Sequence, residues 1–266
     1  MNVRRIYAIC LRQLFLLLDS PQRFGIIFVH PILDVVLWGF ITRYLDRVAQ
    51  SGFSFVPILL GAIVLWDFLV RVQQGVMIAF LEDVWSRNFL NYFGSPLTIT
   101  EYVAGLVVIS ILTSTAGFLL MAILAGILFG YRIFTLGILL IPFLAILFTF
   151  GLSIGIFIAG FVFRFGPAAE WLAWPIAFFL SPFAGVFYPI SILPTPFQIV
   201  AKLIPASYVF EGMRTVLSMR QASILLLLVG ITLACLYLIL AYLFFVRTYR
   251  VVLKSGLITR FSAEQV

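Results

Sequence analysis

Apolar segments of about 20 residues, long enough to cross the hydrocarbon layer of a membrane, recur along the whole chain. The composition agrees, because 64% of the residues are hydrophobic and 10% are charged, and the mean hydropathy is +1.19. Soluble domains have about 45–50% apolar and about 25% charged residues. Lipid offers no hydrogen bonds to the backbone, so segments of this kind cross a membrane as helices. The sequence therefore predicts an all-α, multi-pass membrane protein with a single transmembrane domain over residues 1–266.

Six segments are predicted to be transmembrane helices, and their approximate ranges are 24–45, 55–81, 101–129, 134–163, 171–187 and 223–246. A tight turn at 130–133 joins the third to the fourth, and small residues spaced by four in both predict close helix packing. An even number of spans puts both termini on the same side of the membrane. Placing them in the cytoplasm leaves more Lys and Arg residues inside than outside, as the positive-inside rule requires. We therefore expect both termini to be cytoplasmic.

The net charge of +7 would suggest nucleic acid as the partner of a soluble protein. In a membrane protein, basic residues flank the spans and contact anionic lipid, so we expect lipid and no nucleic acid as the partner. Cys10 and Cys235 lie in different apolar segments, and this spacing predicts neither a disulfide framework nor a metal site.

Residues 1–22 are predicted to form an interface helix, centred on 3–19. Arg5, Arg12 and Asp19 repeat every seven residues and share one face, while apolar side chains cover the other. Such a helix lies in the interface plane of a membrane rather than crossing it. The alternative is that it begins a long first span, which would bring those charges into lipid.

Two pairs of ionisable residues are predicted within the spans: His30 with Asp34 in the first, and Asp67 with Arg71 in the second. Each pair is four residues apart and so lies on one helical face. Ionisable residues inside a membrane point to function, for example proton transfer or ion coupling. The alternative is that each pair is neutralised and only fixes helix packing.

Residues 82–98 are predicted to form a short amphipathic helix on the cytoplasmic face, ended by Gly94-Ser95-Pro96. The residues expected to contact a partner there are Glu82, Asp83, Arg87, Phe89, Tyr92, Phe93, Ser95 and Pro96. Acidic and basic groups followed by exposed aromatic side chains suit docking into a groove of another protein. An ordinary helix with its aromatic rings among lipid headgroups is the alternative.

Residues 181–214 form an apolar, proline-rich stretch with the sequence SPFAGVFYPISILPTPFQIVAKLIPASYVFEGMR. A continuous helix cannot contain prolines at this density, because each removes an amide donor and clashes with the preceding turn. Irregular backbone at membrane depth is tolerated only inside protein or beside a cavity. We therefore expect re-entrant helices here, before the last span and next to whatever the protein moves or binds.

No catalytic motif is present: the sequence lacks G-x-x-x-x-G-K-[ST], H-E-x-x-H and G-x-S-x-G, and it contains a single histidine. We therefore expect no catalytic residues and no bound metal. Any energy from ATP would have to enter through another chain.

The whole chain resembles the membrane subunit of ABC-2 type (type V fold) export transporters. The resemblance is carried by the order of the segments, by GSPLT after the cytoplasmic helix, and by a string of matching residues before the last span. In order, these are Gly185, Tyr188, Pro189, Leu193, Pro194, Pro205, Tyr208, Glu211, Gly212 and Arg214. Unlike the fused members of the family, the protein is expected to have neither an ATPase domain nor a large extracellular domain.

The resemblance implies that 82–98 is a coupling helix against a separate ATPase subunit and that 181–214 gates the exit of a translocation path. It implies a homodimer in the bacterial inner membrane with two ATPase copies, which would bind ATP and magnesium while this chain binds no cofactor. The substrate would be amphiphilic, drug-like or lipid-like, or alternatively a lipid-linked polysaccharide. Two hypotheses of other classes remain, an ion-coupled carrier that uses the polar pairs and a membrane scaffold without transport. No internal repeat of the kind common in carriers is evident.

Overall fold

The computed structural model describes residues 2–19, 21, 25–49, 56–86, 88, 91–92, 94–219 and 223–255. Within these ranges the chain forms helices, turns and loops, with no strand. The helical elements in chain order are α1 (Val3–Asp19), η1 (Gly25–Val29), α3 (His30–Ala49), η2 (Val56–Leu60), α4 (Gly61–Trp85), α6 (Ile99–Phe129), η3 (Ile133–Leu139), α7 (Leu140–Phe165), η4 (Pro167–Leu172), α8 (Ile176–Leu180), η5 (Ile190–Ile192), α9 (Thr195–Leu203), α10 (Pro205–Met219) and α11 (Ile224–Lys254).

Four helical segments among the described residues are long and apolar enough to span a membrane: Val56–Trp85, Ile99–Phe129, Ile133–Phe165 and Ile224–Lys254. They correspond to the predicted second, third, fourth and sixth spans. The prediction of an all-helical membrane protein is therefore confirmed.

The other two predicted spans differ from these four. The first corresponds to η1 and α3, and α3 carries Asp34, Arg43, Asp46 and Arg47, which lower its hydropathy. The predicted helix at 171–187 is not continuous, because it consists of the end of η4, a turn, α8 and a further series of turns. Pro175 and Pro182 account for the breaks, since proline cannot donate the amide hydrogen bond that a helix interior requires.

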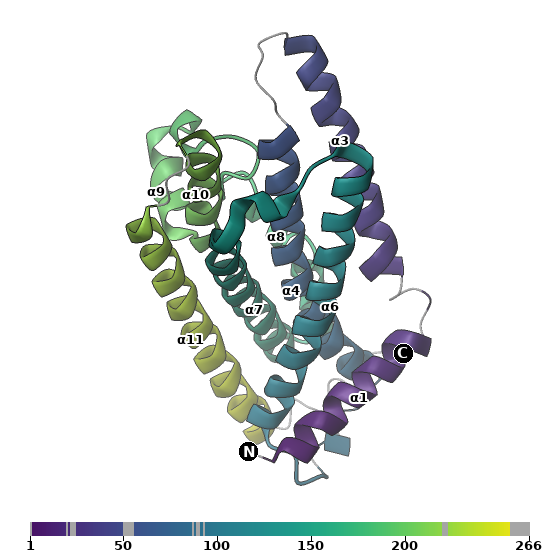
Figure 1. Cartoon of the computed structure of the whole chain (residues 1–266). Helices are drawn as coiled ribbons and strands as arrows, with labels where there is room; N and C mark the ends of the chain where they lie inside the picture. The colour runs from purple at the N-terminus through teal and green to yellow at the C-terminus, as the bar shows by residue number, and fades with distance from the viewer. Residues whose placement is uncertain are drawn as a thin grey trace.

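Helix α4 is the centre of the bundle, with α6 and α7 packed against it and α11 packed against α7 (Figure 1). Its most apolar part is 67% buried within the chain, compared with 17% for α11. Three polar side chains of α4, those of Asp67, Arg71 and Gln73, are buried. The polar content of α4 thus reflects its central position.

Small residues on α7 explain how closely it approaches α4. A Cβ at Gly151 would lie 2.8 Å from the carbonyl oxygen of Leu69, and one at Gly155 would lie 2.8 Å from that of Gln73. The small-residue spacing in the predicted fourth span therefore marks the contact with α4. The predicted turn at 130–133 is also confirmed: Gly130 ends α6 in the left-handed conformation with φ of 71°.

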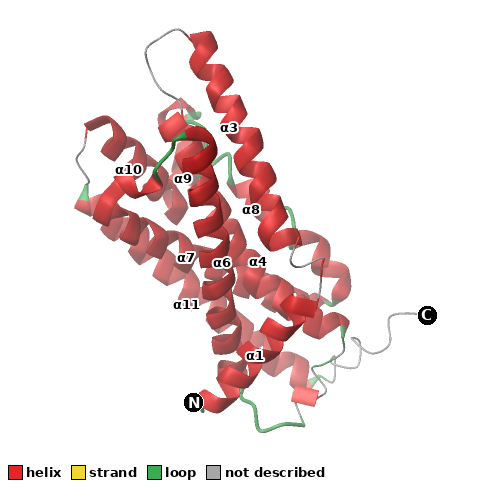
Figure 2. Cartoon of the chain, turned by 45° about the vertical axis from the view of Figure 1, so that its right-hand side comes forward, coloured by secondary structure: helices red, strands yellow, loops and turns green. Residues whose placement is uncertain are grey.

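Helix α1 has the predicted bounds and lies across one end of α6, at the end of the bundle where α4 also ends (Figure 2). We refer to this end as the α1 end. Helices α9 and α10 lie at the opposite end (Figure 1). The sites described below are divided between these two ends and the middle of α4.

Candidate functional site

The carboxylate of Asp83, in the last turn of α4, is completely buried at the α1 end. Arg12 of α1 forms an ion pair with it at 2.6 Å, and the hydroxyl of Tyr102 on α6 donates a hydrogen bond at 2.7 Å. The hydroxyl of Tyr92 accepts from Arg12 and donates to Asp83, and the Asn88 amide donates at 3.4 Å. A buried charge is tolerated when it is paired and hydrogen-bonded in this way. We call these five residues the Asp83 network.

A second set of contacts joins the start of α1 to the start of α6. Glu101 forms a capping box with Thr98, in which each side chain accepts a hydrogen bond from the backbone of the other residue. The same carboxylate accepts from the backbone amide of Asn2 at 2.6 Å and pairs with Arg5 at 3.3 Å. Arg5 and Arg12 of α1 therefore contact α6 and α4, respectively.

The predicted coupling residues occupy different environments at this end. Glu82 and Asp83 belong to the last turn of α4 rather than to a separate helix, and Asp83 does not reach the surface. Ser95 and Pro96 are exposed in the loop before α6. The other predicted contacts, Arg87, Phe89 and Phe93, lie outside the described residues.

Tyr92 is half-buried rather than exposed as expected, because its hydroxyl lies between Arg12 and Asp83. Burial, followed by the nearby Asp83 carboxylate, raises the pKa of Tyr92 well above the usual tyrosine value. The phenol stays protonated and keeps donating at physiological pH. Tyr92 thus holds the 82–98 segment in place through its contacts with Arg12 and Asp83.

At the opposite end, Arg214 and Glu211 of α10 hold the turn that contains Gly185. The Arg214 guanidinium donates to the carbonyl oxygens of Gly185 and Val186 and pairs with Glu211 at 3.1 Å. Glu211 also accepts the backbone amide of Ile190 at 2.8 Å. Gly185 has a φ of 70°, a conformation that favours glycine. Burial lowers the pKa of Arg214 while Glu211 opposes the shift, and we call this arrangement the Arg214 brace.

The other predicted residues of 181–214 shape the same region. Pro189 precedes η5, Pro194 precedes α9, and α10 begins at Pro205. The hydroxyl of Tyr188 donates to the carbonyl of Pro182 at 2.9 Å, and that of Tyr208 donates to the carbonyl of Lys202 at 2.8 Å. The sequence string that carries the resemblance is thus a set of helix starts and turn-closing hydrogen bonds.

The two predicted polar pairs come together between α3 and α4. Nδ1 of His30 lies 3.0 Å from Oδ2 of Asp34, and the ligand atoms of His30, Asp34 and Asp67 all lie within 4.8 Å of one another. Arg71 contacts both carboxylate oxygens of Asp67. One imidazole and two carboxylates are ligand types for a cation, yet the guanidinium already occupies Asp67. Gly117 of α6 makes room for Arg71, since a Cβ there would lie 2.7 Å from its Cδ.

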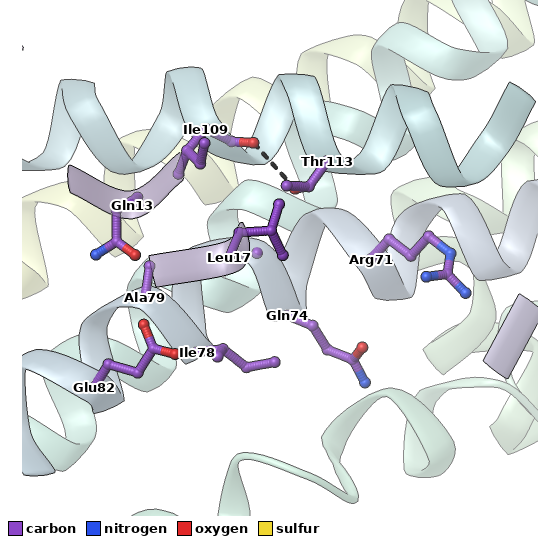
Figure 3. A pocket seen from close by; sticks show the side chains of 10 residues that line it. Gln13, Leu17, Arg71, Gln74, Ile78, Ala79, Glu82, Ile109 and Thr113 are labelled. Carbon is purple, nitrogen blue, oxygen red and sulfur yellow. Dashed lines mark hydrogen bonds between the residues drawn. The ribbon is translucent and has the colours of Figure 1, made fainter. Parts of the chain in front are cut away.

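A cleft lies between α1, α4 and α6 at the α1 end (Figure 3). Gln13 and Leu17 line it from α1, Ile109 and Thr113 from α6, and Arg71 and Glu82 from opposite ends of its α4 wall. Neither Gln13 nor Ile109 was among the predicted functional residues. Gln13 is a polar residue beside the apolar face of α1. A sequence pattern therefore assigns its side chain to solvent, whereas the structure buries it.

The family model of the ABC-2 type transporter matches residues 4–218, from α1 to the end of α10. The chain belongs to the ABC-2 type transporter family. ABC-2 permeases are membrane components of ABC transporters and generally work with an ATPase subunit. The match includes the Asp83 network, the Arg214 brace and the group of His30, Asp34, Asp67 and Arg71, which we call the polar cluster. All three lie in the ABC-2 region of the chain. No curated protein matches the chain.

Proposed function

We propose that this chain is the permease subunit of an ATP-driven exporter in the bacterial inner membrane. Two copies would form the translocation path and would work with two copies of a separate ATPase. ATP and magnesium would be bound by that ATPase, and this chain would bind no cofactor. Family membership supports the ABC transporter assignment, and the lack of a P-loop motif is the reason for assigning ATP hydrolysis to another chain.

The observation that carries the coupling proposal is the Asp83 network. It joins α1, the end of α4 and the 82–98 segment through buried, charge-assisted contacts. A force on this segment would therefore be transmitted to α4, and α4 is the central helix of the bundle. Asp83 and Tyr92 would act as positioning residues, whereas Glu82, Arg87, Phe89, Phe93, Ser95 and Pro96 are proposed to contact the ATPase.

We propose six membrane spans, with α3 and the broken segment around α8 added to the four long helices, and with both termini in the cytoplasm. Charged α3 would then be covered by the second protomer or by the path itself. At the outer side, α9 and α10 would be re-entrant, and the Arg214 brace would hold the gate turn at Gly185. The translocation path would open along the first, second and fifth spans.

The substrate proposed is an amphiphile, drug-like or lipid-like, because aromatic and aliphatic side chains dominate the chain, with 29 Phe among them. A lipid-linked polysaccharide is the alternative within the same family, since aromatic rings also stack on sugars. Identification of the lipid or glycan that co-purifies with the chain decides between them.

The polar cluster favours a second candidate function, an ion-coupled carrier. His30, Asp34, Asp67 and Arg71 form one group of neighbouring ionisable side chains between α3 and α4, in which Asp67 and Arg71 are buried and His30 is exposed. Transport that survives ATP depletion but stops on addition of an uncoupler would favour this function. Transport that stops with ATP depletion alone would favour the exporter.

The deciding experiment is purification of the tagged chain from its native membrane in mild detergent, followed by mass spectrometry. We expect one P-loop ATPase in an amount equal to this chain. Replacing Phe93 or Glu82 with alanine should uncouple ATP hydrolysis from transport while the dimer persists. Recovery of this chain without an ATPase, and no ATPase stimulation on mixing with candidate subunits, would contradict the exporter proposal.

A further inference from the structure

The cleft at the α1 end is shaped by small residues on α4. Its volume is about 70 Å³, and Gly75 and Ala79 form part of its wall. A water molecule needs roughly 10–15 Å³ by this measure, so several groups of that size fit. The space therefore suits a polar group with a few methylenes, and the rest of a larger molecule would lie outside the cleft.

Gln13 gives the cleft an unusual polar group. Its side chain is 3% exposed, and its Nε2 is buried with no hydrogen-bond partner among the residues that the structure describes. Buried amides in folded proteins are nearly always hydrogen-bonded, because leaving the donor unsatisfied destabilises the fold. In Figure 3 the amide extends from α1 toward α4, near Ala79 and above Glu82. The cleft is thus lined by an amide donor that has no acceptor among the described residues.

The other groups that line the cleft restrict which chemical group can supply this acceptor. The carboxylate of Glu82 faces the same end of the cleft and accepts hydrogen bonds (Figure 3). Between this end and Arg71, the walls are the apolar side chains of Leu17, Ile78 and Ile109 together with the polar side chains of Gln74 and Thr113. The Thr113 hydroxyl donates to the carbonyl oxygen of Ile109 within α6. A hydroxyl group both accepts from Gln13 and donates to Glu82, whereas an ammonium group cannot accept and a phosphate would be repelled by the carboxylate.

We infer that this cleft binds the hydroxyl-bearing head of an amphiphile, with the adjoining methylenes against Leu17, Ile78 and Ile109. The inference rests on the proposed exporter function and deepens it, since it gives the substrate class a first binding site beside α4. The cleft lies next to the Asp83 network, on the same helices α1, α4 and α6. A ligand in the cleft would therefore contact the helices that the Asp83 network joins to the proposed ATPase-binding segment, 82–98.

The test is photolabelling of the full chain in lipid nanodiscs with octanol that carries a diazirine on its alkyl chain. Mass spectrometry should find adducts on Leu17, Ile78 or Ile109 in excess of those on Leu236 and Leu243, which are exposed on α11. Octane with the same diazirine should show no such excess. Adducts confined to α11 would mean that the cleft holds water alone, and equal cleft labelling by both probes would mean that no hydroxyl is recognised; either result overturns the inference.

Two variants sharpen the test. Gln13→Leu should reduce cleft adducts about fivefold, as expected for the loss of one hydrogen bond of ordinary strength. Ala79→Leu should remove them by filling the space. Gln198→Leu, on α9 at the opposite end, is the matched control and should leave cleft labelling unchanged.

Each variant is also tested for thermal stability and for recovery with the ATPase. A variant that keeps the wild-type melting temperature reports on binding rather than folding. Recovery of the ATPase tests the proposed function separately. If no ATPase co-purifies but the cleft is still labelled, only the exporter proposal is refuted. Unchanged labelling in both Gln13→Leu and Ala79→Leu would refute the proposal that the cleft binds the amphiphile.

Discussion

Replacing Arg12 with glutamine should release α1 from the rest of the bundle. The Asp83 carboxylate is 0% exposed, and Arg12 is the cation paired with it at 2.6 Å. Breaking a buried ion pair costs about 3–5 kcal/mol. The lower end of this range applies, because Arg12 is 29% exposed and Tyr92 and Tyr102 still donate to Asp83. A loss of about 3 kcal/mol raises the undocked fraction of α1 about a hundredfold.

Cys10 provides the assay. It lies on α1 with its Sγ 3.6 Å from the carbonyl oxygen of Gly105 on α6, and it is half-buried at that contact. Cys235, which is exposed on α11, is first replaced by alanine so that Cys10 is the single reactive thiol. The rate of maleimide labelling in nanodiscs then follows the undocked population of α1. Arg12→Gln should raise that rate by up to about a hundredfold.

Arg4→Gln is the control, because it removes the same charge from an exposed position on the same helix. It should leave the labelling rate of Cys10 unchanged. Equal rates in the Arg12 and Arg4 variants would refute the reasoning, since they would mean that the buried pair does not hold α1 in place.

Three further predictions concern single side chains. Tyr102→Phe removes a hydroxyl that donates to the Asp83 carboxylate, so thermal unfolding should show a loss of about 1.5–3 kcal/mol, whereas Tyr7→Phe at an exposed position should change nothing. Gly185→Ala places a Cβ 3.0 Å from Cγ1 of Ile190 at a φ of 70°, so the melting temperature should fall by the equivalent of about 1–2 kcal/mol, and an unchanged value would contradict the turn geometry. Burial raises the pKa of the Cys10 thiol, so the docked state is favoured while the thiol is protonated and that contribution is lost as pH rises through the raised pKa. The pH midpoint of Cys10 labelling should therefore lie above that of a free thiol and move down in Arg12→Gln; identical midpoints would contradict this.

The sequence was sufficient for the long helices, because hydropathy depends on composition alone. The predicted third span, 101–129, differs from α6 by two residues at its start, and α1 has the predicted bounds. The predicted helix at 171–187 is interrupted, because Pro175 and Pro182 break it although its average hydropathy is high. The same breaking effect of proline was recognised a few residues later, at 181–214, where prolines are denser.

The sites were predicted less completely, because their geometry depends on contacts between distant segments. The i, i+4 spacing identified His30 with Asp34 and Asp67 with Arg71, but no local pattern shows that the two pairs meet. Amphipathicity placed the arginines of α1 on a polar face, yet that face meets Asp83 and Glu101, which lie far along the chain. Glu82 and Asp83 lie in the last turn of α4, where a helix favours basic side chains, and this was a signal that could have suggested a basic partner.

The ion pair between Arg12 and Asp83 also has an evolutionary consequence. A chain that loses the arginine keeps a buried carboxylate with no paired cation, and one that loses the aspartate keeps a half-buried Arg12 without this anion, so each change alone is selected against. Relatives should therefore show correlated substitution at positions 12 and 83, with both charges kept or both replaced by neutral side chains. Positions 92 and 102 should follow the same history, because a phenol that donates to a carboxylate loses its role when the carboxylate disappears.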